Sequence, residues 1–212
     1  MSSLLGFAFF AALLTITPGL DTLLVLRVTG SGGRAAGVAA AAGIATGCLV
    51  WGTASAVGVT ALLTASRLAF DALRIAGAAY LVWLGVRALW TVRRRPDEDR
   101  TDAPALPAGQ HWSRGRAMRT GLTTNLLNPK VGAFYLSVLP QFLPDGVNPL
   151  AGSMALTAIH ALEGMLWLSA VVLVVNRART LLSRPSVRRR FEQLTGVVLV
   201  GFGIRLALDH AA

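Results

Sequence analysis

One stretch, from Gly121 to Phe142, is apolar and long enough to cross a bilayer, yet it is interrupted near its middle. Asn128, Pro129 and Lys130 form the interruption. Proline removes a backbone donor and clashes with the preceding helical turn, and an amide and an ammonium are costly in hydrocarbon. The pattern predicts a helix broken inside the membrane that faces a protein-lined or water-filled cavity. The alternative is a proline kink with Lys130 reaching to the surface.

Apolar blocks of this kind recur along the whole chain of 212 residues, of which 54% are hydrophobic and only 14% charged. A soluble domain would need polar faces on its helices, and these blocks have almost none. We therefore predict an all-α, polytopic integral membrane protein with six transmembrane helices in one transporter domain, residues 1–212. The expected spans are 4–26, 38–63, 75–92, 121–142, 149–175 and 191–208.

The first apolar block is interrupted as well. Pro18 and Gly19 follow Thr17, and a carboxylate comes two residues later at Asp21. Pro18 and Gly19 are therefore expected to break the first helix, as Pro129 breaks the fourth. No Lys or Arg precedes Arg27, so the block lacks the positive region of a signal peptide, and we expect it to be retained.

The two interruptions indicate an internal repeat, because Gly85-Val86-Arg87 and Gly203-Ile204-Arg205 recur at a similar offset near the ends of the third and sixth blocks. We expect repeat one over 1–92, a cytoplasmic linker over 93–115, and repeat two over 116–212. Three helices per half is an odd number, so the halves must insert with opposite topology. Paired broken helices in inverted repeats are typical of a transport site at their interface.

Arginine is distributed very unevenly between the loops. The net charge is +10, and sixteen of the twenty basic residues lie in or beside the first, third and fifth connections. Positive loops face the cytoplasm, so both termini should lie outside it. No recognition motif accompanies the arginines, so we do not expect a nucleic-acid partner; the expected surroundings are the lipid bilayer.

Small residues in the second block predict close helix packing, because Gly43 and Gly47 form a G-x-x-x-G pattern. The pattern suits packing within one chain, and the alternative is contact between two copies in a homodimer. The one cysteine, Cys48, excludes an internal disulfide and a multi-cysteine metal site.

Three segments resemble a known family when they are taken together. They are Thr17 to Asp21 (T-P-G-L-D), Gly77 to Gly85 (G-A-A-Y-L-V-W-L-G), and Gly121 to Phe142 with N-L-L-N-P-K and P-Q-F. In this order they resemble the lysine-exporter (LysE) superfamily, and in particular its RhtB branch of homoserine, threonine and neutral amino-acid exporters. The family usually has a second proline where this chain has Leu20. The resemblance implies an inner-membrane efflux carrier driven by the proton gradient, without ATP hydrolysis.

Asp21, Asn125, Asn128 and Lys130 are the candidate substrate-binding residues. An amino-acid zwitterion needs an anion for its ammonium and a cation, or helix N-terminal amides, for its carboxylate. Asp21 and Lys130 have those charges, one in each half, and the two asparagines add neutral hydrogen bonds. The alternative is that the two charges pair with each other as a structural clamp.

His160 and Glu163 are the candidate proton-coupling residues. They are three apart in the fifth span, so they share a helix face, and a carboxyl group in an apolar site binds a proton more readily than in water. The alternative is a hydrogen-bonded pair that stabilises packing. Two such residues are too few for a metal site, so none is expected.

The most consistent function is a proton-coupled amino-acid efflux carrier of the cytoplasmic membrane. The chain has no phosphate loop, no G-x-S-x-G and no metal-binding histidine pair, so we expect neither an enzyme nor a cofactor. Three alternatives stay open: export of another small solute, export of a metal cation, or a membrane subunit that transports nothing.

Overall fold

The computed structural model describes residues 2–17, 19–94, 112–143, 146–175 and 185–208, and all regular structure within them is helical. The elements are α1 (Ser2–Ile16), α2 (Leu20–Ala65), α3 (Arg67–Arg94), α4 (Arg114–Leu126), α5 (Pro129–Ala133), the π-helical turn η1 (Phe134–Val138), the 3-10 turn η2 (Leu139–Phe142), α6 (Pro149–Leu173) and α8 (Pro185–Leu208).

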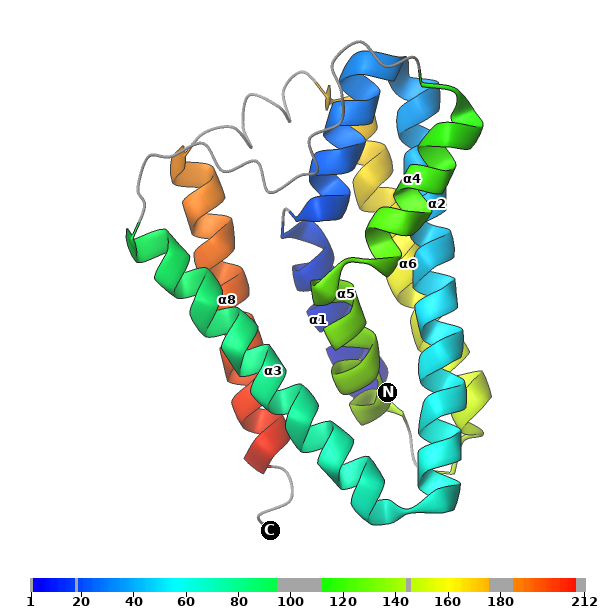
Figure 1. The fold of residues 1–212 in the computed structure, drawn as a ribbon, viewed down its shortest axis with the longest axis vertical. Helices are drawn as coiled ribbons and strands as arrows, with labels where there is room; N and C mark the ends of the chain where they lie inside the picture. Colours follow the sequence, from blue (N-terminus) through cyan, green and yellow to red (C-terminus); the bar gives the residue numbers. More distant parts are fainter. Residues whose placement is uncertain (1, 18, 95–111, 144–145, 176–184, 209–212) are drawn as a thin grey trace.

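The helices run back and forth along one axis of the molecule (Figure 1). α1 and the first part of α2 run toward the end of the molecule at which α4 begins. There α2 reverses direction at Gly33, whose φ of 80° is open to glycine at little steric cost. The second part of α2 runs down to the turn at Ser66 in the view of Figure 1, and α3 runs back up. After that, α4 and α5 run down, α6 runs up and α8 runs down.

Both predicted helix breaks are present. α1 ends at Ile16 before α2 begins at Leu20, and Pro18 itself lies outside the described residues. α4 ends at Leu126, and α5 restarts at Pro129. Asn128 caps the restart, since its Oδ1 accepts a hydrogen bond of 3.1 Å from the Lys130 backbone N–H. Proline suits the first position of a helix, where its missing N–H leaves no bond unmade.

The helices are longer than the apolar blocks, and four predicted boundaries are wrong for that reason. Between the second and third expected spans, 64–74 is helical except at Ser66; before the fourth span, 114–120 belongs to α4; and before the sixth span, 185–190 belongs to α8. Between the first and second expected spans, 27–37 is helical apart from Gly33. Hydropathy identifies only the part of a helix whose side chains are apolar. The helix itself can extend further, because its backbone hydrogen bonds continue and its arginine side chains reach water. Of the expected linker, 93–115, residues 95–111 lie outside the described residues.

In the part of the chain that the structure describes, two helices are long and apolar enough, by length and composition, to cross a membrane: Leu20–Gly58 within α2, and Pro149–Leu173. Large apolar side chains also lie on the outside of the molecule. Leu5 and Phe9 on α1 are each 69% exposed, and Leu166 on α6 is 65% exposed. An apolar exterior of this kind is what a surface in contact with lipid requires.

Glycines allow α2 and α4 to pack at close range. A Cβ on Gly43 would overlap the Met118 carbonyl oxygen, and one on Gly121 would overlap the Ala40 carbonyl oxygen. Gly47 lies directly against the side chain of Asn125. The prediction that Gly43 and Gly47 serve packing within one chain is confirmed, and their use in a homodimer seam stays a prediction.

Gly43→Val should therefore destabilise the fold by about 2 kcal/mol or more, because backbone atoms cannot move aside as a flexible side chain can. The matched control is Gly58→Val on the same helix, since a Cβ at Gly58 has nothing within 4 Å. Thermal unfolding of the detergent-solubilised variants measures both effects. Equal midpoints for the two variants would contradict the close crossing.

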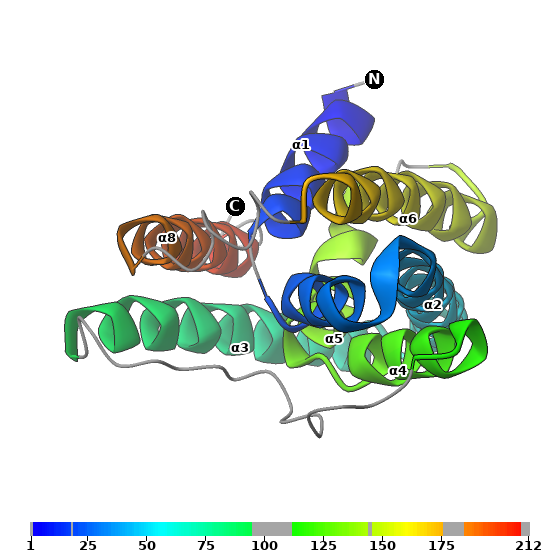
Figure 2. The same ribbon diagram turned by 90° about the horizontal axis from the view of Figure 1, so that it is seen from above.

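α3 and α8 form a pair that lies beside the other helices (Figure 2). Gly85 and Gly196 bring their backbones together, and Gly203 lies against the Ala78 carbonyl. Aromatic contacts join the pair to α1, where the Phe10 and Phe202 ring centroids are 4.5 Å apart. The two helix breaks lie among α1, α2, α4, α5 and α6, and the α3–α8 pair lies beside this group.

Candidate substrate site

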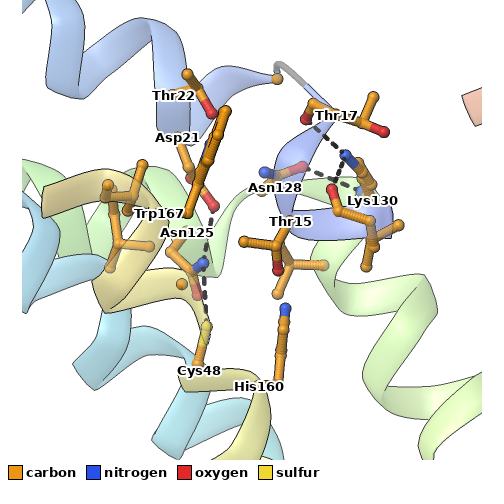
Figure 3. Close-up of a pocket in the computed structure, with 16 residues that line it drawn as sticks. Thr15, Thr17, Asp21, Thr22, Cys48, Asn125, Asn128, Lys130, His160 and Trp167 are labelled. Carbon is orange, nitrogen blue, oxygen red and sulfur yellow. Dashed lines mark hydrogen bonds between the residues drawn. The ribbon is translucent and has the colours of Figure 1, made fainter. Parts of the chain in front are cut away.

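A cavity of about 60 Å³ lies where the two helix breaks meet, with walls from α1, α2, α4, α5 and α6 (Figure 3). This volume holds roughly four water molecules. Charged, polar and apolar side chains share the lining, which consists of Leu14, Thr15, Thr17, Gly19, Asp21, Thr22, Ile44, Cys48, Asn125, Asn128, Lys130, Val131, His160, Gly164, Trp167 and Leu168. All four predicted substrate-binding residues are among them.

Asp21 lies in the first turn of α2, directly after the first break. Its Oδ2 accepts a hydrogen bond of 3.0 Å from Nδ2 of Asn125, which is fully buried in the last turn of α4. The same Nδ2 lies 3.6 Å from the sulfur of Cys48. Asn125 reaches this place because Gly47, one residue before Cys48, has no side chain to displace it.

Lys130 reaches in the opposite direction, from the second break to the first. Its Nζ donates hydrogen bonds of 2.7 Å to the Leu14 carbonyl and 3.2 Å to the Thr17 carbonyl. These carbonyls lie at the end of α1, where the break deprives the last turn of its helical partners. A cation is favourable there because the carbonyl end of a helix carries partial negative charge.

Each of the two charged side chains is thus hydrogen-bonded to a residue of the opposite half of the chain. Asp21 of the first half bonds to Asn125 of the second, and Lys130 of the second half bonds to carbonyls of the first. Both charged side chains belong to the described part of the chain, and no ion pair between them is recorded within it. The alternative of a direct clamp thus has no recorded ion pair behind it among the described residues, and it stays a hypothesis to be tested by mutation.

Four polar atoms of the cavity lining are buried without a hydrogen-bond partner among the described residues. Two are acceptors, Asp21 Oδ1 and Asn125 Oδ1; one is a donor, Trp167 Nε1; and Thr15 Oγ1 is both. Buried polar atoms are nearly always paired in folded proteins. The cavity therefore offers hydrogen-bonding capacity of both kinds to a small polar ligand.

The two predicted coupling residues are placed differently. His160 lines the cavity, and its Nδ1 lies 3.0 Å from the hydroxyl of Tyr135 on η1. Glu163 is not part of the lining, and its Oε2 is buried without a partner among the described residues. No hydrogen bond between His160 and Glu163 is recorded in this part of the chain, so the alternative of a bonded packing pair is not seen.

Sequence reasoning missed Thr15, Cys48, Tyr135 and Trp167. The G-x-x-x-G pattern next to Cys48 was the one available indication, because it marks where another helix passes closely. Nothing in the local sequence distinguishes Trp167 from the other large apolar residues of its block. Among the described residues, no three His, Cys, Asp or Glu side chains come together in a group that could hold a metal ion.

Broken helices around a polar cavity, inside a bundle with an apolar exterior, are the features of a membrane transporter. The chain belongs to the LysE type translocator family, whose model matches residues 12–210. The match confirms the resemblance seen in the sequence.

Several named proteins are similar over nearly the full length. The membrane protein YrhP of Bacillus subtilis is 30% identical over 99% of this chain and 100% of its own length. A leucine efflux protein of Klebsiella pneumoniae is 30% identical over 93% of this chain and 91% of its own, and a threonine efflux protein of Escherichia coli K12 is 27% identical over 92% of each. No solved structure matches. The family and these names indicate a transporter and not an enzyme.

Proposed function

We propose that this protein is an efflux carrier of the cytoplasmic membrane for a small neutral amino acid. The observation that carries the proposal is the cavity between the two breaks, which presents Asp21, Lys130 and four polar atoms that have no partner among the described residues. The printed names of relatives, leucine and threonine efflux proteins, support a substrate of this class.

The lining suits the two ends of a zwitterion. Asp21 Oδ1 and Asn125 Oδ1 are adjacent acceptors for the ammonium group, since the two side chains are already joined by a hydrogen bond. Trp167 Nε1 is a donor for the carboxylate. Lys130 uses two of its three ammonium hydrogens on carbonyls, so the third is available to the same carboxylate.

Six spans in two inverted halves are the architecture that fits this function. The first half would comprise α1 to α3 and the second α4 to α8, each opening with a broken helix. The opposite directions of the corresponding helices in Figure 1 support this arrangement, and so does the crosswise bonding at the two breaks. Carriers built in this way expose a fixed central site alternately to the two sides of the membrane.

The arginine distribution supports an orientation with the start of α4 in the cytoplasm and the turn before α6 outside. In a Cys48→Ala background, Val147→Cys should react with a membrane-impermeant maleimide added to intact cells. Ser113→Cys should react only after the cells are opened. Both positions are exposed in the structure, so accessibility is decided by the membrane. The reverse pattern would overturn the proposed orientation.

Proton antiport is the coupling that fits the acidic and imidazole groups near the cavity. His160 contacts the cavity directly, and Glu163 lies one turn further along α6 with an unpartnered oxygen. An uncoupler should stop net export, and Glu163→Gln should do so while substrate exchange continues. Export that persists after the proton gradient has collapsed would exclude this mechanism.

The test of the function is counterflow in proteoliposomes with a panel of radiolabelled amino acids that includes leucine and threonine. The chain's one cysteine, Cys48, supplies an internal reporter, because it lines the cavity and is buried, so an alkylating reagent reaches it only when the cavity opens. A transported amino acid should slow alkylation of Cys48 by N-ethylmaleimide, and Cys48→Ala should show no labelling. Absence of counterflow for every amino acid, with unaltered labelling of Cys48, would overturn the proposal.

A further inference from the structure

A second cavity, of about 340 Å³, lies on the other side of the α4–α5 break. Its walls come from α2, α3 and the segment from α4 to η1. The lining residues are Trp51, Ala76, Gly77, Tyr80, Leu126, Leu127, Asn128, Pro129, Gly132, Ala133, Leu136 and Ser137. The volume is at the lower end of the range that small-molecule sites occupy, about 300–1,000 Å³.

The two cavities lie on opposite sides of the break, and their linings alternate along the chain from Asn125 to Val131. The second cavity extends further along the descending chain, to Ser137 on η1. On α2 its lining residue is Trp51, which is nearer to the end of α2 at Ala65 than Cys48 of the central cavity is. The second cavity therefore extends beyond the central one toward the Ser66 turn.

Asn128 is the residue that the two linings share. Its Oδ1 is held by the Lys130 backbone N–H, so the side chain stands at the restart of the broken helix and divides the two spaces. Around it the backbone leaves the α-helical pattern at Leu127 and again in the π-helical turn η1. The partition thus lies between two departures from α-helical geometry, one at Leu127 and one in η1.

The second cavity carries its own binding chemistry. Trp51 Nε1 is buried without a partner among the described residues, so it is a donor with no protein acceptor. The remaining lining is largely apolar. The cavity also reaches the surface, since Leu127 is 81% exposed and Tyr80 is 38% exposed. An apolar wall with one unmet donor suits the side chain and carboxylate of a neutral amino acid.

We propose that the second cavity is the release site of the carrier, which receives the amino acid from the central cavity when the partition at Asn128 moves. This inference rests on the proposed function. It identifies the substrate's exit with the space between α3 and α5, on the side of the Ser66 turn. It also makes Trp51, which the central cavity does not use, a contact of the departing substrate.

Ala76→Trp tests the proposal by filling the second cavity. Ala76 is exposed and lines that cavity alone, so an indole there leaves the central lining unchanged. Efflux of preloaded leucine should slow by about tenfold or more, which corresponds to a barrier increase of about 1.4 kcal/mol. Leucine should still protect Cys48 from alkylation, because the central site is intact.

The matched control is Ala79→Trp, which places the same bulk at an exposed position of α3 that lines neither cavity. It should export at the normal rate. Normal export by Ala76→Trp, or equal loss in both variants, would overturn the proposal; the first result would mean that lipid or solvent occupies the cavity. Failure of leucine to protect Cys48 in the unmodified protein would count against the proposed function instead.

A second measurement tests the proposal even if the Ala76→Trp variant folds poorly. In a Cys48→Ala background, saturating leucine should slow alkylation of Ala76→Cys and leave the alkylation rate of Ala79→Cys unchanged. Both substitutions are small and lie on the exposed side of α3. Equal rates with and without leucine at Ala76→Cys would show that no substrate visits the cavity.

Discussion

Asp21→Asn should lower leucine counterflow by about 100-fold or more, and the protein should still reach the membrane in near-normal amounts. The asparagine keeps the shape of the side chain, and its Oδ1 can still accept the 3.0 Å bond from Asn125. The substitution removes the anionic oxygen that faces the cavity without a partner. Loss of one member of a buried charged contact costs about 2–5 kcal/mol, which is large enough to account for the expected loss of counterflow.

Asp21→Glu is the control, because it retains the charge and displaces it by one methylene. We expect Asp21→Glu to retain clearly more counterflow than Asp21→Asn, with equal membrane abundance for both on immunoblots. Normal counterflow in Asp21→Asn would show that the substrate's ammonium group does not depend on this carboxylate. Loss of both variants from the membrane would assign Asp21 a purely structural role.

Lys130→Gln should reduce both transport and membrane abundance, in contrast to Asp21→Asn. The ammonium of Lys130 bonds to the Leu14 and Thr17 carbonyls at the open end of α1. The shorter, neutral glutamine cannot maintain both contacts, so two buried acceptors lose a charged donor. An unsatisfied buried group costs about 1–3 kcal/mol, and more when its partner is a charge. Lys130→Arg keeps the charge and is the control.

The double variant Asp21→Asn/Lys130→Gln separates crosswise bonding from direct pairing. If the two charges neutralised each other, removal of both would restore the abundance that either single substitution lowers. The structure has separate partners for each charge, so the double variant should be no more abundant than Lys130→Gln alone. Recovery of abundance in the double variant would contradict this, and the measurement is the amount of folded protein by fluorescence-detected size exclusion.

These variants also test which residues are committed to the fold and which to the ligand. Among the described residues, the Lys130 ammonium bonds to two backbone carbonyls, whereas Asp21 Oδ2 accepts a bond from Asn125 and Asp21 Oδ1 has no recorded partner. Lys130 is therefore expected to serve the fold first and the substrate with its remaining hydrogen. Asp21 is expected to serve the substrate first.

The sequence alone was sufficient to predict the two helix breaks, because their cause is local. Proline cannot continue a helix, asparagine caps the next one, and polar side chains at that depth need a cavity. The same short motifs predicted the family, which the match over residues 12–210 confirmed. The ends of the helices were predicted less well, because arginine-rich segments remain helical beyond the ends of the apolar blocks. Hydropathy detects only the apolar blocks.

The sequence by itself thus determined an all-helical chain with an apolar exterior, broken near residues 18 and 129, and the types of charge placed at those breaks. Only the tertiary structure decided what those charges contact. The bonds from Asp21 to Asn125 and from Lys130 to Leu14 join residues 104 and 116 positions apart. Such distant contacts depend on how closely α2 and α4 cross at their glycines. No local pattern encodes that distance, and neither the unpartnered Trp167 nor the second cavity could be foreseen without it.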